Sequence, residues 1–207
     1  MTTDVVRQIT DRIAPDFELL FSRETTQQIV AESLDELTEQ ATVAAWLPTF
    51  VERFARDRLR ALAKTEHLVD DERPAVLFLC VHNAGRSQMA AGLLRHASGG
   101  AIAVYSGGSE PASEINPVAV RAMTEIGIDI ANEFPKPWTN EVVGAVDVVV
   151  SMGCGDACPV LPGKCYVEWE LEDPAGKPIE VVRRVREEIG RRVANLVSEL
   201  GVEPRSV

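Results

Sequence analysis

The stretch that decides the fold is AVLFLCVHNAGRS, residues 75–87. Its first five residues form a continuous apolar run, typical of a strand buried on both faces of a parallel sheet. A helix is predicted directly after the stretch, from Ser87 to Ala97, with Met89 and Leu94 on its buried face. The polar residues between strand and helix therefore lie at the carboxyl end of a strand, where parallel sheets bind ligands.

Further strands and helices alternate along the rest of the chain. Asn116-Pro117 is a typical start for a helix, here running to Gly127, and a long closing helix is predicted from Pro178 to Leu200. This alternation predicts an α/β fold with a doubly wound parallel sheet. The other expected strands are 102–105, 146–150 and 167–171.

The first seventy residues differ in composition, because all 14 glycines come later in the chain. Apolar residues at helical spacing predict three short helices, the first ended by Pro15, the second capped by Ser22 and the third with Pro48 in its first turn. We therefore expect a small three-helix bundle over residues 1–70 and an α/β domain over residues 74–207. The bundle carries no chemical motif, and we interpret it as a packing module or a homodimer interface.

The overall composition excludes several classes of protein. The chain has 207 residues, 45% of them hydrophobic, and its 32 acidic against 21 basic residues give a formal charge of −11. A nucleic-acid partner is not expected, because neutralising phosphates requires a basic face. With no apolar run of transmembrane length and no secretory signal, we expect no membrane partner and a cytoplasmic protein.

The loop after the first strand has the residues of an oxyanion site with a cysteine at its mouth. Five residues separate Cys80 from Arg86, enough chain to form a cup of backbone N–H groups at a helix N-terminus. The guanidinium of Arg86 matches two oxygens of a tetrahedral anion, and the same field favours a thiolate at Cys80. Gly85 allows close approach, and Asn83 tolerates a left-handed backbone and can brace the loop.

Residues 80–87 resemble the C-x5-R-S loop of the low molecular weight tyrosine phosphatases and of the arsenate reductases built on the same fold. The resemblance extends over about residues 75–200 and implies that Cys80 is the nucleophile. It also implies that the oxyanion is held by the loop residues His82, Asn83, Ala84, Gly85, Arg86 and Ser87. Asp173, followed by Pro174, resembles the aspartate of this family that protonates the leaving oxygen.

Two further cysteines favour the reductase branch of this family. Cys154 and Cys158 follow the predicted strand 146–150, at the same sheet edge as Cys80, and lie within disulfide reach if they share one helical turn. The set resembles the thioredoxin-coupled arsenate reductases with three redox cysteines. The resemblance implies that the disulfide passes from Cys80–Cys154 to Cys154–Cys158 and that thioredoxin supplies the electrons, with no bound cofactor.

Alternatives remain open at this point. A tyrosine phosphatase needs aromatic walls, which Trp138 and Trp169 could form, and a mycothiol-coupled reductase would not use the extra cysteines. A non-enzymatic anion sensor on the same fold would not need Cys80, Arg86 and Asp173 together. Cys165 is interpreted as a strand residue, with replacement of Cys158 or a zinc site together with the other two as lesser options. Ala91 stands where many members have a glutamate of a potassium site, so no metal is expected.

Overall fold

The computed structural model describes residues 2–38, 47–153 and 160–203. The chain forms two compact units, and one of them takes in a segment that is distant in sequence. The first unit comprises Met1–Asp71 together with Thr139–Ala145, and the second comprises Glu72–Trp138 together with Val146–Val207.

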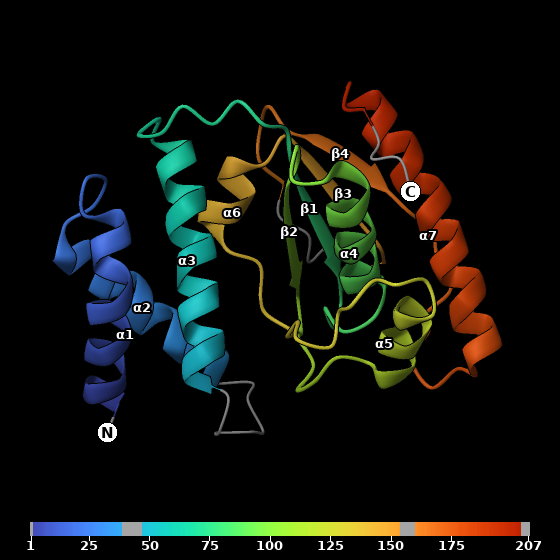
Figure 1. The fold of residues 1–207 in the computed structure, drawn as a ribbon, viewed down its shortest axis with the longest axis horizontal. Helices are drawn as coiled ribbons and strands as arrows, with labels where there is room; N and C mark the ends of the chain where they lie inside the picture. Colours follow the sequence, from blue (N-terminus) through green and yellow to red (C-terminus); the bar gives the residue numbers. More distant parts are fainter. Residues whose placement is uncertain (1, 39–46, 154–159, 204–207) are drawn as a thin grey trace. The chain divides into compact units, whose positions relative to one another are not determined.

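The second unit is built on a four-stranded parallel sheet with the strand order β2-β1-β3-β4 (Figure 1). The paired strands are in register, so Leu79 of β1 lies beside Gly107 of β2 and Ser151 of β3. The carboxyl ends of β1 and β3 therefore meet at one edge, as the parallel pattern predicted. The strands are β1 (Ala75–Cys80), β2 (Ala103–Gly108), β3 (Val148–Ser151) and β4 (Cys165–Glu168).

Three helices pack beside this sheet (Figure 1). The core joins alternate residues of β1 and β3, such as Phe78 and Val150, to the apolar faces of these helices. The helices are α4 (Arg86–Ser98), α5 (Pro117–Thr124) and α7 (Ile179–Glu199). All three were predicted, and the side chain of Asn116 caps α5 by accepting hydrogen bonds from the Val118 and Ala119 N–H groups.

The last two strands differ from the predicted ranges. β3 is shorter than expected, and β4 begins at Cys165 rather than at residue 167, which confirms that Cys165 is a strand residue. The shift at β4 has a physical reason, since this strand pairs only with β3 and is mostly exposed. It therefore lacks the apolar pattern by which buried strands are recognised.

The first unit contains the three predicted N-terminal helices, α1 (Thr2–Phe17), α2 (Arg23–Thr38) and α3 (Leu47–Thr65). Ser22 caps α2 by accepting a hydrogen bond from the Thr25 N–H at 3.1 Å. The expected end of α1 at Pro15 is wrong, because this proline lies inside the helix. Pro15 removes one hydrogen bond of the helix, and only two helical residues follow it, so the helix ends within one turn of the proline.

A fourth helix in this unit, α6 (Asn140–Ala145), was not predicted. It lies in the sequence just before β3, yet it packs with α3, where a side chain at Gly144 would touch Thr65. Arg58 of α3 is buried and forms ion pairs with Glu141 of α6 at 2.7 Å and with Glu32 of α2 at 2.8 Å. One guanidinium thus connects three helices of the unit.

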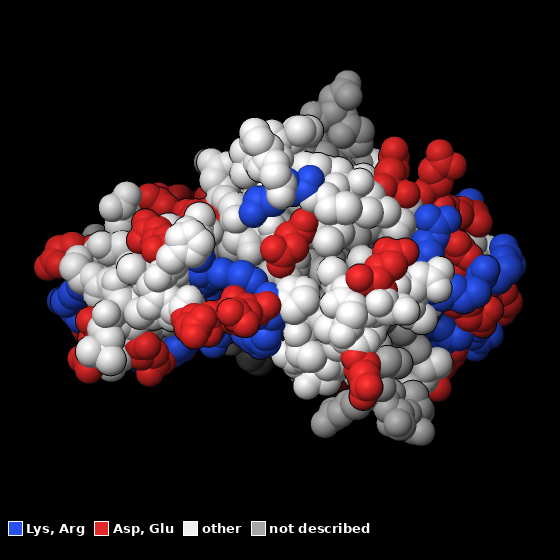
Figure 2. Space-filling model, turned by 90° about the horizontal axis from the view of Figure 1, so that it is seen from above, with Lys and Arg blue, Asp and Glu red and all other residues white. Residues whose placement is uncertain are grey.

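Charged side chains of both signs alternate over the described surface. Figure 2 shows acidic and basic groups interspersed on one face, and the described residues form no extended basic area there. Arginines of α7 form ion pairs with nearby glutamates, as Arg183 does with Glu125 and Arg192 with Glu188. Among the described helices, none has both the length and the apolar character needed to cross a bilayer.

Candidate active site

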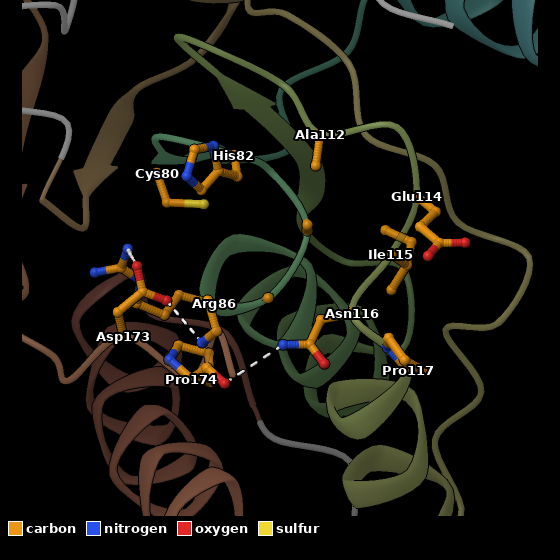
Figure 3. A pocket seen from close by; sticks show the side chains of 13 residues that line it. Cys80, His82, Arg86, Ala112, Glu114, Ile115, Asn116, Pro117, Asp173 and Pro174 are labelled. Atoms are coloured by element: carbon orange, nitrogen blue, oxygen red, sulfur yellow. Dashed lines mark hydrogen bonds and ion pairs between the residues drawn. The ribbon is translucent and has the colours of Figure 1, made fainter. Parts of the chain in front are cut away.

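A cavity of about 240 Å³ opens at the carboxyl end of β1 (Figure 3). Cys80 and Arg86 line one side of it, and the side chain of Asp173 comes from the loop before α7. The opposite wall is the segment 112–117, between β2 and α5. Residues from three distant parts of the sequence therefore surround one space that is suitable for a small ligand.

Hydrogen bonds beneath the cavity brace the loop from within. Asn83 has a φ of 45°, in the left-handed region, as predicted. Its side-chain carbonyl accepts hydrogen bonds from the backbone N–H of Lys136 at 3.0 Å and from Gln88 Nε2 at 2.9 Å, while its Nδ2 donates to Ser87 Oγ at 2.9 Å. All of these groups are buried, so each bond is shielded from competing water.

Ser87 connects this brace to the cysteine. Its Oγ lies 3.0 Å from Cys80 Sγ. Because this oxygen already accepts a hydrogen bond from Asn83, its own proton is free to point at the sulfur. A hydrogen bond donated to sulfur favours the thiolate over the thiol, and the thiolate is the nucleophilic form.

Arg86 and Asp173 form the charged part of the site. Nη2 of Arg86 donates to Oδ2 of Asp173 at 2.9 Å, and the arginine is buried while the aspartate is half exposed. Asp173 also accepts a hydrogen bond from the Ala175 N–H at 3.0 Å, which shapes the turn that holds it. A cation and a carboxyl group are thus positioned side by side, and the carboxyl group can reach solvent.

Close backbone approach shapes both sides of the loop. The segment 110–116 runs along it, and its N–H groups donate to the carbonyls of Val81, His82 and Ala84 at 2.9 Å. With these carbonyls turned outward, the loop can direct N–H groups toward an anion. A Cβ at Gly108 would lie 2.7 Å from the Val81 carbonyl, so glycine is required there for space, and one at Gly85 would lie 3.0 Å from the Pro174 side chain, a tight contact.

The structure brings together most of the residues that the sequence predicted for the site. The cavity is lined by Cys80, His82, Ala84, Gly85, Arg86 and Asp173. Asn83 and Ser87 lie buried below them and hold the loop. The backbone N–H of Met152 donates to the Leu79 carbonyl, and a Cβ at Gly153 would be 3.3 Å from Arg86 Nη1. Cys154 and Cys158 lie outside the described residues.

Some contributors to the site were missed in the sequence. Asn116 was predicted only as a helix cap, but it also lines the cavity and its Nδ2 donates to the Pro174 carbonyl at 3.5 Å. Gln88 and Lys136 brace Asn83 from buried positions. Gln88 directly follows the loop motif, which is a local signal, whereas Lys136 is 53 residues from Asn83 and no spacing rule identifies it.

The two tryptophans considered as aromatic walls do not line this cavity. Trp169 is buried in the core, with its ring centroid 5.6 Å from that of Phe78, and Trp138 lies against Gly107. Cys165 is exposed on β4. The described parts of the chain hold no cluster of three or more side chains that would bind a metal ion.

Two family models match the chain. Residues 75–206 match the low molecular weight phosphotyrosine protein phosphatase model, and residues 6–63 match a model described as a protein-tyrosine-phosphatase-like N-terminal domain. The first match includes every residue of the cavity, together with Cys154, Cys158 and Cys165.

Curated relatives match about three fifths of the chain. A glutaredoxin arsenate reductase of Synechocystis is 40% identical over 128 residues, which are 60% of this chain and 97% of that protein. An arsenate reductase of Staphylococcus haemolyticus is 42% identical over 122 residues, which are 57% of this chain and 92% of that protein. The matched part therefore corresponds to nearly the full length of both relatives.

Solved structures include a match to both units. A thioredoxin-dependent arsenate reductase of Corynebacterium glutamicum is 42% identical, with a TM-score of 0.87 over 97% of this chain and 98% of that one. An arginine phosphatase of Geobacillus stearothermophilus is 27% identical, with a TM-score of 0.55 over 62% of this chain and 93% of that one. The N-terminal helices are thus shared with the first protein in a match that spans nearly all of both chains.

Proposed function

The chain belongs to the low molecular weight phosphotyrosine protein phosphatase family, and we propose that it is an arsenate reductase that uses a cysteine nucleophile and an intramolecular disulfide relay recycled by thioredoxin. Two observations carry this proposal. The chain matches a thioredoxin-dependent arsenate reductase over 97% of its length, and its cavity groups Cys80, Arg86 and Asp173 as the first chemical step requires.

In the first step, the Cys80 thiolate attacks the arsenic atom of arsenate. Arg86 and the N–H groups of the loop bind the oxygens of the anion. As the S–As bond forms, an As–O bond breaks, and Asp173 supplies the proton with which that oxygen leaves as water. Arg86 already contacts Asp173, so the arriving anion would compete for the guanidinium and leave the carboxyl group free to act.

The electrons come from the cysteines in the second step. Cys154 attacks the Cys80 sulfur, so an S–S bond forms while the S–As bond breaks and its electron pair reduces arsenic to arsenite. Cys158 then attacks Cys154 and releases Cys80 as a thiolate, and the thioredoxin dithiol reduces the Cys154–Cys158 disulfide. The position of Gly153 against Arg86 supports a part for Cys154 in this step, because Gly153 directly precedes Cys154 in the sequence.

The shape of the cavity favours a small inorganic anion over an aryl phosphate. Its described lining combines charged groups such as Arg86 with small or aliphatic residues such as Ala112 and Ile115, and it includes no phenylalanine, tyrosine or tryptophan. A phosphotyrosine ring gains much of its binding energy from stacking on aromatic side chains. The tyrosine phosphatase alternative therefore has weak support, which comes from the shared fold and family.

A paired assay tests the proposal. Purified protein should oxidise NADPH in the presence of arsenate, thioredoxin and thioredoxin reductase, and should hydrolyse p-nitrophenyl phosphate poorly. Cys80→Ser should abolish the first activity, and Cys158→Ser should allow at most one turnover. Steady NADPH oxidation by Cys158→Ser would refute the relay, while efficient phosphate hydrolysis without arsenate-dependent turnover would favour the phosphatase.

Three finer points belong to the same proposal. Thioredoxin rather than glutaredoxin or mycothiol is the expected reductant, which parallel assays with each system would test. A reducing compartment such as the cytoplasm fits a cycle that must return all three cysteines to thiols. A homodimer through the N-terminal helices stays a prediction, and sedimentation of the full chain over a range of concentrations would test it.

A further inference from the structure

Lys136 is a buried lysine that the steps above do not use. It lies in the segment between α5 and α6 and is only 5% exposed. Burying an ammonium group costs several kcal/mol even after relaxation. A methionine of similar volume would avoid this cost, so the lysine at this position requires an explanation.

The surroundings of its side chain consist of groups that attract a cation. Nζ donates to Ser106 Oγ at 3.4 Å and to the Phe134 carbonyl at 3.5 Å, and it lies 4.5 Å from the centroid of the Phe134 ring. Oxygen acceptors and the face of an aromatic ring both favour the protonated amine. These are contacts that the ammonium group of a lysine makes.

The same residue touches the brace of the oxyanion loop. Its backbone N–H donates to Asn83 Oδ1 at 3.0 Å, and its carbonyl accepts from the Gly108 N–H at 2.9 Å. The Phe134 carbonyl, which the ammonium contacts, also accepts from Gln88 Nε2 at 3.1 Å. Lys136 therefore joins the end of β2 to the loop through its main chain and reaches Gln88 through one shared acceptor.

The side-chain amide of Gln88 has fewer hydrogens than there are oxygen acceptors around it. Gln88 Nε2 has two hydrogens but three oxygens within reach, two of them on Asn83 and one on Phe134. An ammonium group supplies three more hydrogens and a full charge. Its presence lets Gln88 stay directed at Asn83, which in turn orients Ser87 toward Cys80.

We propose that Lys136 is a positioning residue of the oxyanion loop, whose buried ammonium group acts through Phe134, Gln88 and Asn83. The reaction places a thiolate and an oxyanion in one cavity, and Arg86 also contacts a carboxyl group. A loop that is held in one position keeps its N–H groups directed at this negative charge. The proposal rests on the proposed function, since it assigns a role within the same site.

The test uses Lys136→Met in the full-length protein, with Lys64→Met at the end of α3 as the matched control. Iodoacetamide modification of Cys80, followed by mass spectrometry of its peptide, is measured at increasing concentrations of inorganic phosphate. We expect Lys136→Met to need about tenfold more phosphate for half protection. In steady state the KM for arsenate should rise by a similar factor, with kcat changed much less. Lys64→Met should match the parent protein in both measurements.

A second variant, Lys136→Ala, separates the effect of the charge from the effect of packing. It also keeps the test decisive if Lys136→Met does not fold. Lys136→Ala leaves a space that an ammonium ion can enter, so ammonium chloride should restore much of the phosphate protection, and sodium chloride at equal ionic strength should not. Unchanged half protection in a folded Lys136→Met protein would overturn the proposal, as would equal effects of the two salts. Because phosphate protection needs no turnover, a parent protein that fails to reduce arsenate would refute the proposed function without deciding the role of Lys136.

Discussion

Asn83 shows how much of the site depends on a single residue. Its left-handed backbone lets the loop turn between β1 and α4, and its amide makes hydrogen bonds in three directions. A left-handed backbone costs free energy in a residue other than glycine, unless local hydrogen bonds of the side chain offset this cost. The hydrogen bonds of the Asn83 side chain therefore stabilise its own backbone conformation. They also hold Ser87 in position beside Cys80.

Substitutions at Asn83 separate these two contributions. Asn83→Ala loses the hydrogen bonds and keeps a Cβ in the left-handed region, which costs about 1 kcal/mol relative to glycine. Asn83→Gly loses only the hydrogen bonds. We expect both variants to have strongly reduced kcat/KM for arsenate, and urea unfolding to show Asn83→Ala as the less stable by about that amount. Equal stabilities would show that the backbone conformation carries no strain.

Gly85 sets the distance between the loop and the general acid. A methyl group there would lie 3.0 Å from Pro174, with φ at −128°, so crowding rather than backbone strain is the cost. We expect Gly85→Ala to displace the Asp173 turn and lower kcat by roughly tenfold, since small misplacements of catalytic groups have large effects. Gly190→Ala in α7, where no atom lies within 4 Å, should keep kcat and increase stability by up to about 1 kcal/mol.

At the scale of elements, the ion pairs of Arg58 hold α2, α3 and α6 together. Arg58→Met would leave Glu141 and Glu32 without their cation, and Glu141 is mostly buried. Breaking such a pair from one side costs about 3 kcal/mol, which thermal and urea unfolding would measure. The control is Arg60→Met, because Arg60 is mostly exposed and its pair with Asp57 is long at 3.6 Å. A loss as small as that of the control would show that the pairs of Arg58 add little stability.

The ion pair between Arg58 and Glu141 predicts how the stability of the protein depends on pH. Burial alone would raise the pKa of the Glu141 carboxyl group, but the hydrogen bond and the charge of Arg58 outweigh burial and hold this pKa below its ordinary value of 4.5. A lowered pKa in the folded state stabilises the protein above the ordinary value, and this stabilisation disappears as pH falls through the folded pKa. The difference in unfolding free energy between the parent and Glu141→Gln should therefore persist at neutral pH and shrink as the pH falls below about 4.5. A constant difference would contradict this assignment.

At the scale of the whole molecule, α6 links the two units through the chain itself. It lies between β2 and β3 in sequence but clusters with the N-terminal helices. A shortened chain of residues 72–207 would expose Val142 and Val143 and remove the partner of Glu141. We expect this chain to melt at a lower temperature and to bind a hydrophobic dye more strongly than the full chain. Equal melting temperatures would show that α6 does not need the N-terminal helices for its stability.

Local patterns predicted most elements of the structure. The apolar run of β1, the caps at Ser22 and Asn116, and the tolerance of Pro48 in the first turn of α3 are all confirmed, because each depends on neighbours in the sequence. α6 was missed because its six residues are too few to show helical spacing. They form a helix within the first unit, where the other helices come from the start of the chain, so their neighbours in sequence do not indicate it.

The sequence by itself determined the position of the nucleophile, since strand, loop and helix follow one another within residues 75–98. It also indicated Arg86 by spacing, and the resemblance to the phosphatase family implied Asp173. Only the tertiary structure decided that Asn116 and Lys136 meet at this loop, and that the tryptophans do not line its cavity. The physical reason is that a loop motif depends on bonds along the chain, whereas the charges and braces around it depend on packing between segments up to 87 residues apart.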